Sequence, residues 1–215
     1  MFRVILFDLD GTLLDPCEGI TGSVAYALQK KGYPVPDMEV LKTFIGPPLT
    51  DQFMAYCGID REAGREMVET YREYYRPIGM LQNERYPGVE EMLQRLRESG
   101  LVLAVASSKP EPFVKKILAH FGMDGYFDFI GGSSLDGTRE NKAAVIGYVL
   151  ENLGVSPSRN VAMVGDRMHD VQGAQVFGLF SLAVTWGHGS REELENAKAD
   201  VLCDTPAEAA AVLLQ

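Results

Sequence analysis

The chain places side chains that can do chemistry directly behind short apolar runs. Asp8 and Asp10 follow the run 4–7, Ser107 follows 101–106, Asp166 follows 161–164, and Lys142 stands before a helical pattern after the run 127–130. Carboxylates are ligands for Mg²⁺, which keeps further positions for water and substrate oxygens. A hydroxyl and a lysine can orient and neutralise a transferring phosphoryl group, because such catalysis is mostly positioning and charge stabilisation. These residue types together favour Mg²⁺-assisted phosphoryl transfer.

The two aspartates behind the first run could divide the work of such a reaction. A carboxylate can attack phosphorus and form an aspartyl-phosphate. Asp8 and Asp10 are separated by one residue, so both can lie at one rim of a site in different environments. One can then attack while the other transfers protons.

The apolar runs predict the elements that would bring these side chains together. Each run is continuous rather than alternating, as expected for strands buried on both faces of a sheet. Helical patterns lie between the runs, and three of them end at Gly100, Gly122 and Gly154, where glycine accepts the left-handed conformation. Strands that alternate with helices indicate an α/β protein with a Rossmann-like parallel sheet. The carboxyl ends of all its strands share one edge, where ligands bind.

The interval between the first two strands is too long for a simple crossover. More than ninety residues separate the runs 4–7 and 101–106, whereas a crossover needs about a dozen. The helix predicted at 89–99 supplies that crossover, so the rest of the interval is an insertion. Its apolar spacing predicts helices near 20–28, 49–57 and 61–75. We therefore expect an α/β core formed by 1–14 and 82–215 and an inserted α-helical cap formed by 15–81.

Composition excludes several classes of protein. Twenty lysines and arginines stand against thirty aspartates and glutamates, which gives a net charge of −10. A nucleic-acid binder or a membrane-surface protein would need a basic face. Cys17, Cys57 and Cys203 share no short spacing, which argues against a disulfide framework or a zinc ribbon and fits a cytoplasmic setting. We expect the protein to be a monomer or a weak homodimer. Its expected partner is a small phosphorylated metabolite, which it binds as substrate.

Four motifs resemble those of the haloacid-dehalogenase-like hydrolases. Residues 8–15 read DLDGTLLD and are similar to the first signature of that family. Ser107 resembles its second motif, Lys142 its third, and residues 165–170 its fourth. The order and spacing agree over essentially the whole chain.

This resemblance implies a role for each matching acidic residue. Asp8 would be the nucleophile and a Mg²⁺ ligand. Asp10 would be the general acid and then the base, and would lend its backbone carbonyl to the metal. Asp166 would be a further metal ligand, and Asp170 would orient a water or Lys142.

The same resemblance implies the groups that hold the substrate. Ser107 and the following amide of Ser108 would bind the phosphoryl group together with Lys142. Gly11 belongs to the turn behind Asp10, and Gly46 lies in a loop that resembles the cap loop of phosphoglycolate-phosphatase-like and bacterial nucleotidase-like members. For the lysine, Lys109 and Lys115 remain rivals of Lys142.

Other positions bear on the branch of the family. Dehalogenases lack the second acid, so Asp10 favours phosphate chemistry, and Thr12 favours a phosphatase over a sugar phosphomutase. Residues 131–138 also resemble nucleotidase-like members, whereas Ser107-Ser108 departs from the Thr-Asn of many phosphoglycolate phosphatases. The expected function is a Mg²⁺-dependent phosphatase of small phosphate monoesters. A sugar phosphomutase, an inorganic pyrophosphatase and a non-enzymatic phospho-acceptor module are the alternatives.

Overall fold

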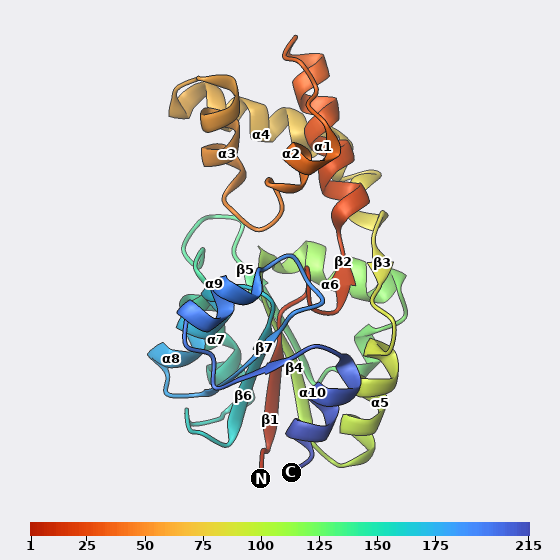
Figure 1. The fold of residues 1–215 in the computed structure, drawn as a ribbon, viewed down its shortest axis with the longest axis vertical. Helices are drawn as coiled ribbons and strands as arrows, with labels where there is room; N and C mark the ends of the chain where they lie inside the picture. Colours follow the sequence, from red (N-terminus) through yellow and green to blue (C-terminus); the bar gives the residue numbers. More distant parts are fainter. The chain divides into compact units, whose positions relative to one another are not determined.

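A six-stranded parallel sheet organises the computed structural model, which describes residues 1–215 (Figure 1). The strand order is β5-β4-β1-β6-β7-β8, and every neighbouring pair is parallel. The strands are β1 (Val4–Phe7), β4 (Val102–Pro110), β5 (Phe129–Ser133), β6 (Val161–Gly165), β7 (Phe180–Val184) and β8 (Val201–Cys203). The predicted Rossmann-like α/β fold is confirmed.

Helices cover both faces of this sheet, which explains the continuous apolar runs. Figure 1 shows α7 and α8 on one side of the sheet and α5 and α10 on the other. The helices of this part are α5 (Val89–Glu98), α6 (Glu111–His120), α7 (Lys142–Leu153), α8 (Met168–Val176), α9 (Arg191–Asn196) and α10 (Pro206–Leu213), with a 3₁₀ turn η2 (Asp124–Tyr126). None of the helices in the chain combines the length and the apolar character that a membrane crossing requires.

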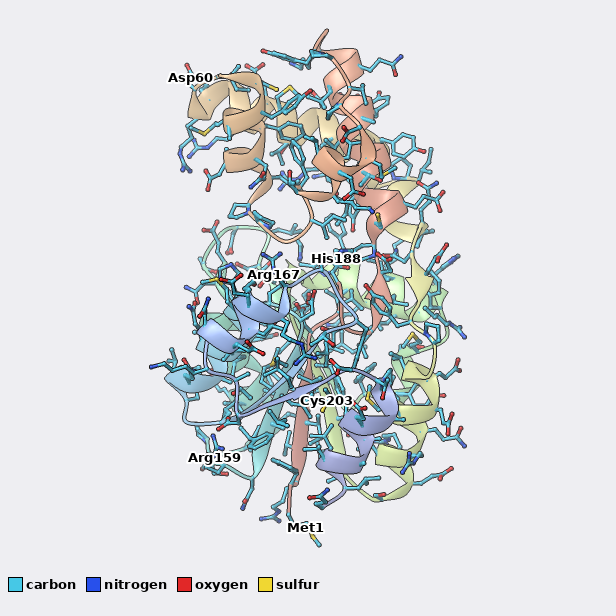
Figure 2. The ribbon with its side chains drawn as sticks, viewed as in Figure 1. Met1, Asp60, Arg159, Arg167, His188 and Cys203 are labelled. Atoms are coloured by element: carbon cyan, nitrogen blue, oxygen red, sulfur yellow. The ribbon has the colours of Figure 1, made fainter.

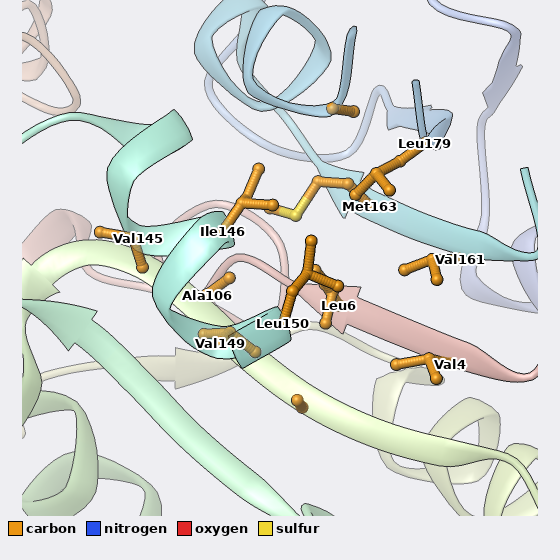
Figure 3. Close-up of a cluster of buried hydrophobic side chains, with 12 residues drawn as sticks. Val4, Leu6, Ala106, Val145, Ile146, Val149, Leu150, Val161, Met163 and Leu179 are labelled. Carbon is orange, nitrogen blue, oxygen red and sulfur yellow. The ribbon is translucent and has the colours of Figure 1, made fainter. Parts of the chain in front are cut away.

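One buried cluster ties the central strands to α7 (Figure 3). Leu6 of β1 and Met163 of β6 lie beneath Ile146 and Leu150 of α7, and all four are at most 3 % exposed. Burying such a side chain stabilises the fold by about 1.5–3 kcal/mol. This packing sets the position of α7 over the sheet and therefore of its first residue, Lys142.

Contacts divide the chain into two compact units. One consists of Met1–Leu14 and Arg85–Gln215 and contains the whole parallel sheet; the other is Asp15–Glu84. The chain crosses between the units at β2 (Leu14–Asp15) and β3 (Glu84–Arg85), which pair with each other.

The second unit is helical. It contains α1 (Cys17–Lys30), α2 (Met38–Lys42), α3 (Leu49–Cys57), α4 (Arg61–Tyr75) and the 3₁₀ turn η1 (Gly79–Leu81). Tyr71 and Tyr75 are buried in it and stack on each other with ring centroids 5.1 Å apart. Gly19 allows α1 to approach η1, because a Cβ there would lie 1.9 Å from the Gly79 carbonyl oxygen.

A polar network joins the starts of β6, β7 and β8, near the place where Figure 2 labels Arg159. The Arg159 guanidinium donates to both carboxylate oxygens of Asp200 at 2.7 and 2.9 Å. The Asp200 carboxylate also accepts from the N–H and the hydroxyl of Ser181. Arg159, assisted by Ser181, outweighs burial and lowers the pKa of Asp200 to about 2.

This network predicts a pH dependence of stability. The pKa of an aspartate in the unfolded chain is about 3.9. The contribution of Asp200 to the free energy of unfolding is therefore fully present above that pH, and it is lost as the pH falls towards about 2. We expect Asp200→Asn to lower the melting temperature at about pH 6 and to have a smaller effect at about pH 3. Thermal denaturation at both values measures this. An equal effect at the two pH values would contradict the assignment.

Candidate active site

Three neighbouring strands deliver the predicted site residues to one edge of the sheet. Asp8 follows β1, Ser107 lies within β4, and Asp166 follows β6, while β1 pairs with β4 on one side and with β6 on the other. Phe7 is in register with Val105 and with Val164, so the residues beyond these positions emerge side by side. The shared edge is the one at which ligands bind in open α/β sheets.

Lys142 joins two of the acidic residues. Its Nζ lies 2.9 Å from Oδ1 of Asp8 and 2.8 Å from Oδ1 of Asp170, and it also donates to the Ala106 carbonyl oxygen at 2.9 Å. Asn141 caps α7 by accepting the N–H of Ala144 and thereby fixes the helix start that carries Lys142. Burial acts to lower the pKa of Lys142, but Asp170 and Asp8 outweigh it and raise that pKa. Lys142 is therefore a buried ammonium.

Asp170 holds this lysine in place. Its carboxylate is 2 % exposed, and its Oδ2 accepts the N–H of Arg167 at 3.1 Å in the capping box of α8. Burial raises the pKa of Asp170 to about 6 against the opposing effect of Lys142. Asp170 thus lies in the first turn of α8, where its Oδ1 contacts Lys142 and its Oδ2 is held by the N–H of Arg167.

Asp166 is buried with fewer compensating charges. It is 1 % exposed; its Oδ2 accepts the N–H of His188 at 2.8 Å, and the hydroxyl of Thr12 lies 3.5 Å from its Oδ1. Burial, then Asp170 and Asp8, raise the pKa of Asp166 to about 8, although the His188 N–H favours the charged form.

Asp8, Asp166 and Asp170 form a donor set that fits a hard cation. Each offers a carboxylate oxygen, all three oxygens lie within 4.8 Å of one another, and all three residues are buried. Lys142 neutralises only part of this charge, and buried carboxylates are costly unless they are paired or bind a metal. An all-oxygen set with positions left for water and substrate is the set that Mg²⁺ prefers.

Glycines allow the chain to close around Asp166. A Cβ on Gly11, whose φ is +79°, would lie 2.1 Å from Oδ2 of Asp166. A Cβ on Gly187 would lie 2.2 Å from the Gly11 carbonyl oxygen and 2.4 Å from the Asp166 Cβ. The sequence analysis missed the packing role of Gly187.

A second lysine serves Asp10. Nζ of Lys109 lies 2.7 Å from both Oδ1 and Oδ2 of Asp10. Ser107 is 2 % exposed, and its hydroxyl accepts the N–H of Lys109 at 3.3 Å, whereas Ser108 is exposed. The sequence analysis considered Lys109 only as an alternative to Lys142 for the lysine that binds the phosphoryl group. In the structure the two lysines contact different aspartates.

Two further predicted residues belong to other elements of the chain. Gly46 belongs to the second unit, in the loop between α2 and α3, with a φ of +101°. Lys115 is exposed and pairs with Glu111 on its own helix.

Comparison with known proteins identifies the family to which this chain is similar. A model of the haloacid dehalogenase-like hydrolases matches residues 5–184. A 5′-nucleotidase from Pseudomonas aeruginosa is 45% identical over 190 residues, which are 88% of this chain and 86% of that protein. The tyrosine-protein kinase PtkA from Mycobacterium tuberculosis is 38% identical over 200 residues, 93% and 68% of the two chains. A phosphoglycolate phosphatase from Aliivibrio fischeri is 30% identical over 211 residues, 94% and 92% of the two chains.

The fold is also found among solved structures. A crystal structure of a predicted phosphatase from Clostridium acetobutylicum superposes with a TM-score of 0.93 at 44% sequence identity, and the match covers 100% of this chain and 99% of that chain.

Proposed function

This chain belongs to the haloacid dehalogenase-like hydrolases, and we propose that it is a Mg²⁺-dependent phosphatase that hydrolyses small phosphate monoesters through an aspartyl-phosphate. The observation that carries the proposal is the separate pairing of two aspartates, in which Lys142 contacts Asp8 and Lys109 contacts Asp10. The two carboxylates therefore have different partners, which allows them to take the separate roles of nucleophile and acid–base group. Two of the relatives are named as a 5′-nucleotidase and a phosphoglycolate phosphatase, which supports the proposed hydrolysis of phosphate monoesters.

The first step forms a bond between Asp8 and the substrate phosphorus. A carboxylate oxygen of Asp8 attacks phosphorus, the ester P–O bond breaks, and the leaving oxygen takes a proton from Asp10. The buried Lys142 ammonium beside Asp8 neutralises charge on the transferring oxygens. The hydroxyl of Ser107 and the N–H of Ser108 would hold the phosphoryl group at the end of the same strand.

The second step regenerates Asp8. Asp10, now deprotonated, takes a proton from water as the water attacks phosphorus, and inorganic phosphate leaves. Of the three clustered carboxylates, those of Asp8 and Asp166 would hold Mg²⁺ together with the backbone carbonyl of Asp10, and Asp170 would remain the partner of Lys142. When bound, the cation neutralises the carboxylates so that an anionic substrate can approach them. Asp170 would keep Lys142 oriented during both steps.

The proposed substrates are phosphoglycolate or nucleoside 5′-monophosphates, as the names of two relatives suggest. Gly46 and its loop would contribute to substrate selection. The three free cysteines agree with the proposed cytoplasmic location, and a monomer or weak homodimer remains the predicted state.

Phosphate release from a panel of phosphorylated metabolites, measured with Mg²⁺ and with EDTA, tests this function. We expect release that requires Mg²⁺ and is strongest for phosphoglycolate or for nucleoside 5′-monophosphates. Strongest release from pyrophosphate would indicate a pyrophosphatase. A lack of release from every compound, with phosphate retained on Asp8, would favour a phosphomutase or a phospho-acceptor module.

Replacement of Asp166 tests the proposed metal site. We expect Asp166→Asn to raise the Mg²⁺ concentration for half-maximal phosphate release by at least about tenfold, since it removes one anionic ligand. It should also reduce the rise in melting temperature that Mg²⁺ causes in the unchanged protein, because ligand binding stabilises the folded state. An unchanged metal titration in both measurements would contradict the assignment.

The glycine beside Asp166 offers a test of positioning. An alanine at 187 would place its Cβ 2.4 Å from the Asp166 Cβ and force a local shift. We expect Gly187→Ala to lower kcat/KM by about 10²-fold, because a displacement of about 1 Å in a site has effects of that size. Gly125→Ala is the matched control, since a Cβ there meets nothing within 4 Å. Equal activity of the two variants would show that the close packing at Gly187 is unimportant.

A further inference from the structure

We propose that Lys109 is a positioning residue that holds the carboxylate of Asp10 in the orientation needed for its two proton transfers. The inference deepens the proposed function and rests on the role of Asp10 in it. Lys109 itself neither attacks the substrate nor transfers its proton.

The contact between Lys109 and Asp10 restrains the carboxylate strongly. One ammonium nitrogen lies 2.7 Å from each of the two oxygens, and the Lys109 side chain is only 8% exposed. Charge-assisted hydrogen bonds of this kind are about twice as strong as neutral ones. Because both oxygens are held from one point, rotation of the carboxylate about its terminal bond is restricted. Lys115 and Glu111 form the contrasting case, since that lysine is 54% exposed and such pairs contribute little.

The backbone of Lys109 is fixed by its neighbours. The pairing of β4 with β5 shifts register between Ser107 and Pro110, so Lys109 lies at an irregularity of the sheet. The Lys109 N–H donates to the Ser107 hydroxyl, and its carbonyl lies so near Gly132 that a Cβ there would be 2.6 Å away. A side chain that leaves from so constrained a backbone can position its partner accurately.

The two lysines of the site act on different carboxylates. Lys142 contacts Asp8 and Asp170, and Lys109 contacts Asp10. Removal of the Lys109 ammonium therefore leaves the contacts of the proposed nucleophile intact. Its effect should be confined to steps that depend on Asp10, namely protonation of the leaving oxygen and activation of water.

The leaving group distinguishes this role from a general structural one. An alkyl phosphate releases a strongly basic oxygen that needs a proton, whereas p-nitrophenyl phosphate releases a stable phenolate that does not. The ratio kcat/KM reports the reaction up to departure of the leaving group, so water activation does not enter it. We expect Lys109→Met to lower kcat/KM by about 10–100-fold for the alkyl phosphate, a part of the 10²–10⁴-fold that acid–base catalysis provides. For p-nitrophenyl phosphate we expect a change below about threefold.

The experiment measures kcat/KM for p-nitrophenyl phosphate and for the alkyl phosphate that the unchanged enzyme hydrolyses best. Lys109→Arg should recover much of the loss because it keeps the cation, and Lys115→Met should match the unchanged enzyme. On an Asp10→Asn background Lys109→Met should have no further effect, since both changes would remove the same contribution. Lys109→Gln replaces Lys109→Met if melting curves show that the latter does not fold.

Equal losses for the two substrates, no loss for either, or full additivity with Asp10→Asn would each overturn the inference. Those outcomes presuppose that the unchanged enzyme releases phosphate. A lack of release by that enzyme would instead overturn the proposed function, and this inference with it.

Discussion

Asp8→Asn is expected to abolish turnover, with a loss of at least about 10⁴-fold in kcat, while the protein remains folded. An amide oxygen is a poor nucleophile, so no aspartyl-phosphate can form. The fold should tolerate the change, because asparagine has nearly the same shape and Lys142 keeps its ion pair with Asp170 at 2.8 Å and its hydrogen bond to the Ala106 carbonyl.

Steady-state phosphate release, melting temperature and covalent labelling measure this outcome together. The unchanged enzyme should acquire phosphoryl label from substrate, and Asp8→Asn should acquire none. Asp128→Asn is a suitable control, since Asp128 pairs with Arg97 away from the cluster. Activity that survives in Asp8→Asn would show that another group is the nucleophile.

Asp10→Asn is expected to lower kcat by about 10²–10⁴-fold and to trap the aspartyl-phosphate. An asparagine cannot accept a proton from water, so the second step stops. With p-nitrophenyl phosphate the first step should still proceed, because its leaving group needs no proton. We therefore expect about one equivalent of p-nitrophenol per enzyme in a rapid burst, followed by little further release.

Rapid mixing and labelling of Asp8 check this second prediction. The label should persist on Asp10→Asn and should be short-lived on the unchanged enzyme. Burst and steady rates equal to those of the unchanged enzyme would contradict the acid–base role of Asp10. A slow first step with p-nitrophenyl phosphate would indicate that Asp10 also positions the substrate.

The fold was predictable because the spacing of apolar residues along the chain reflects how each strand and helix is buried. Strands buried on both faces must be continuously apolar, and the runs 4–7 and 161–164 coincide with β1 and β6 to within one residue at either end. The helices predicted at 49–57 and 61–75 have the observed bounds of α3 and α4. The run 101–106 underestimated β4, which extends to Pro110 because its polar end continues to pair with β5.

The apolar runs were enough to predict which side chains gather at one edge of the sheet, since parallel strands must end together. The sequence did not predict which lysine contacts which aspartate. Asp10 and Lys109 are far apart in the chain, and their contact depends on the irregular end of β4. The place of Lys142 depends equally on how α7 packs over β1 and β6.

The enclosure of Asp166 could not be predicted from the order of the residues. Its partners, Thr12 and the N–H of His188, come from distant parts of the chain, and the closeness of Gly11 and Gly187 to it follows from three loops packed together. Propensity and spacing describe neighbours along the chain. Distances between side chains remote in sequence are set by the packing of helices on the sheet, which no local pattern encodes.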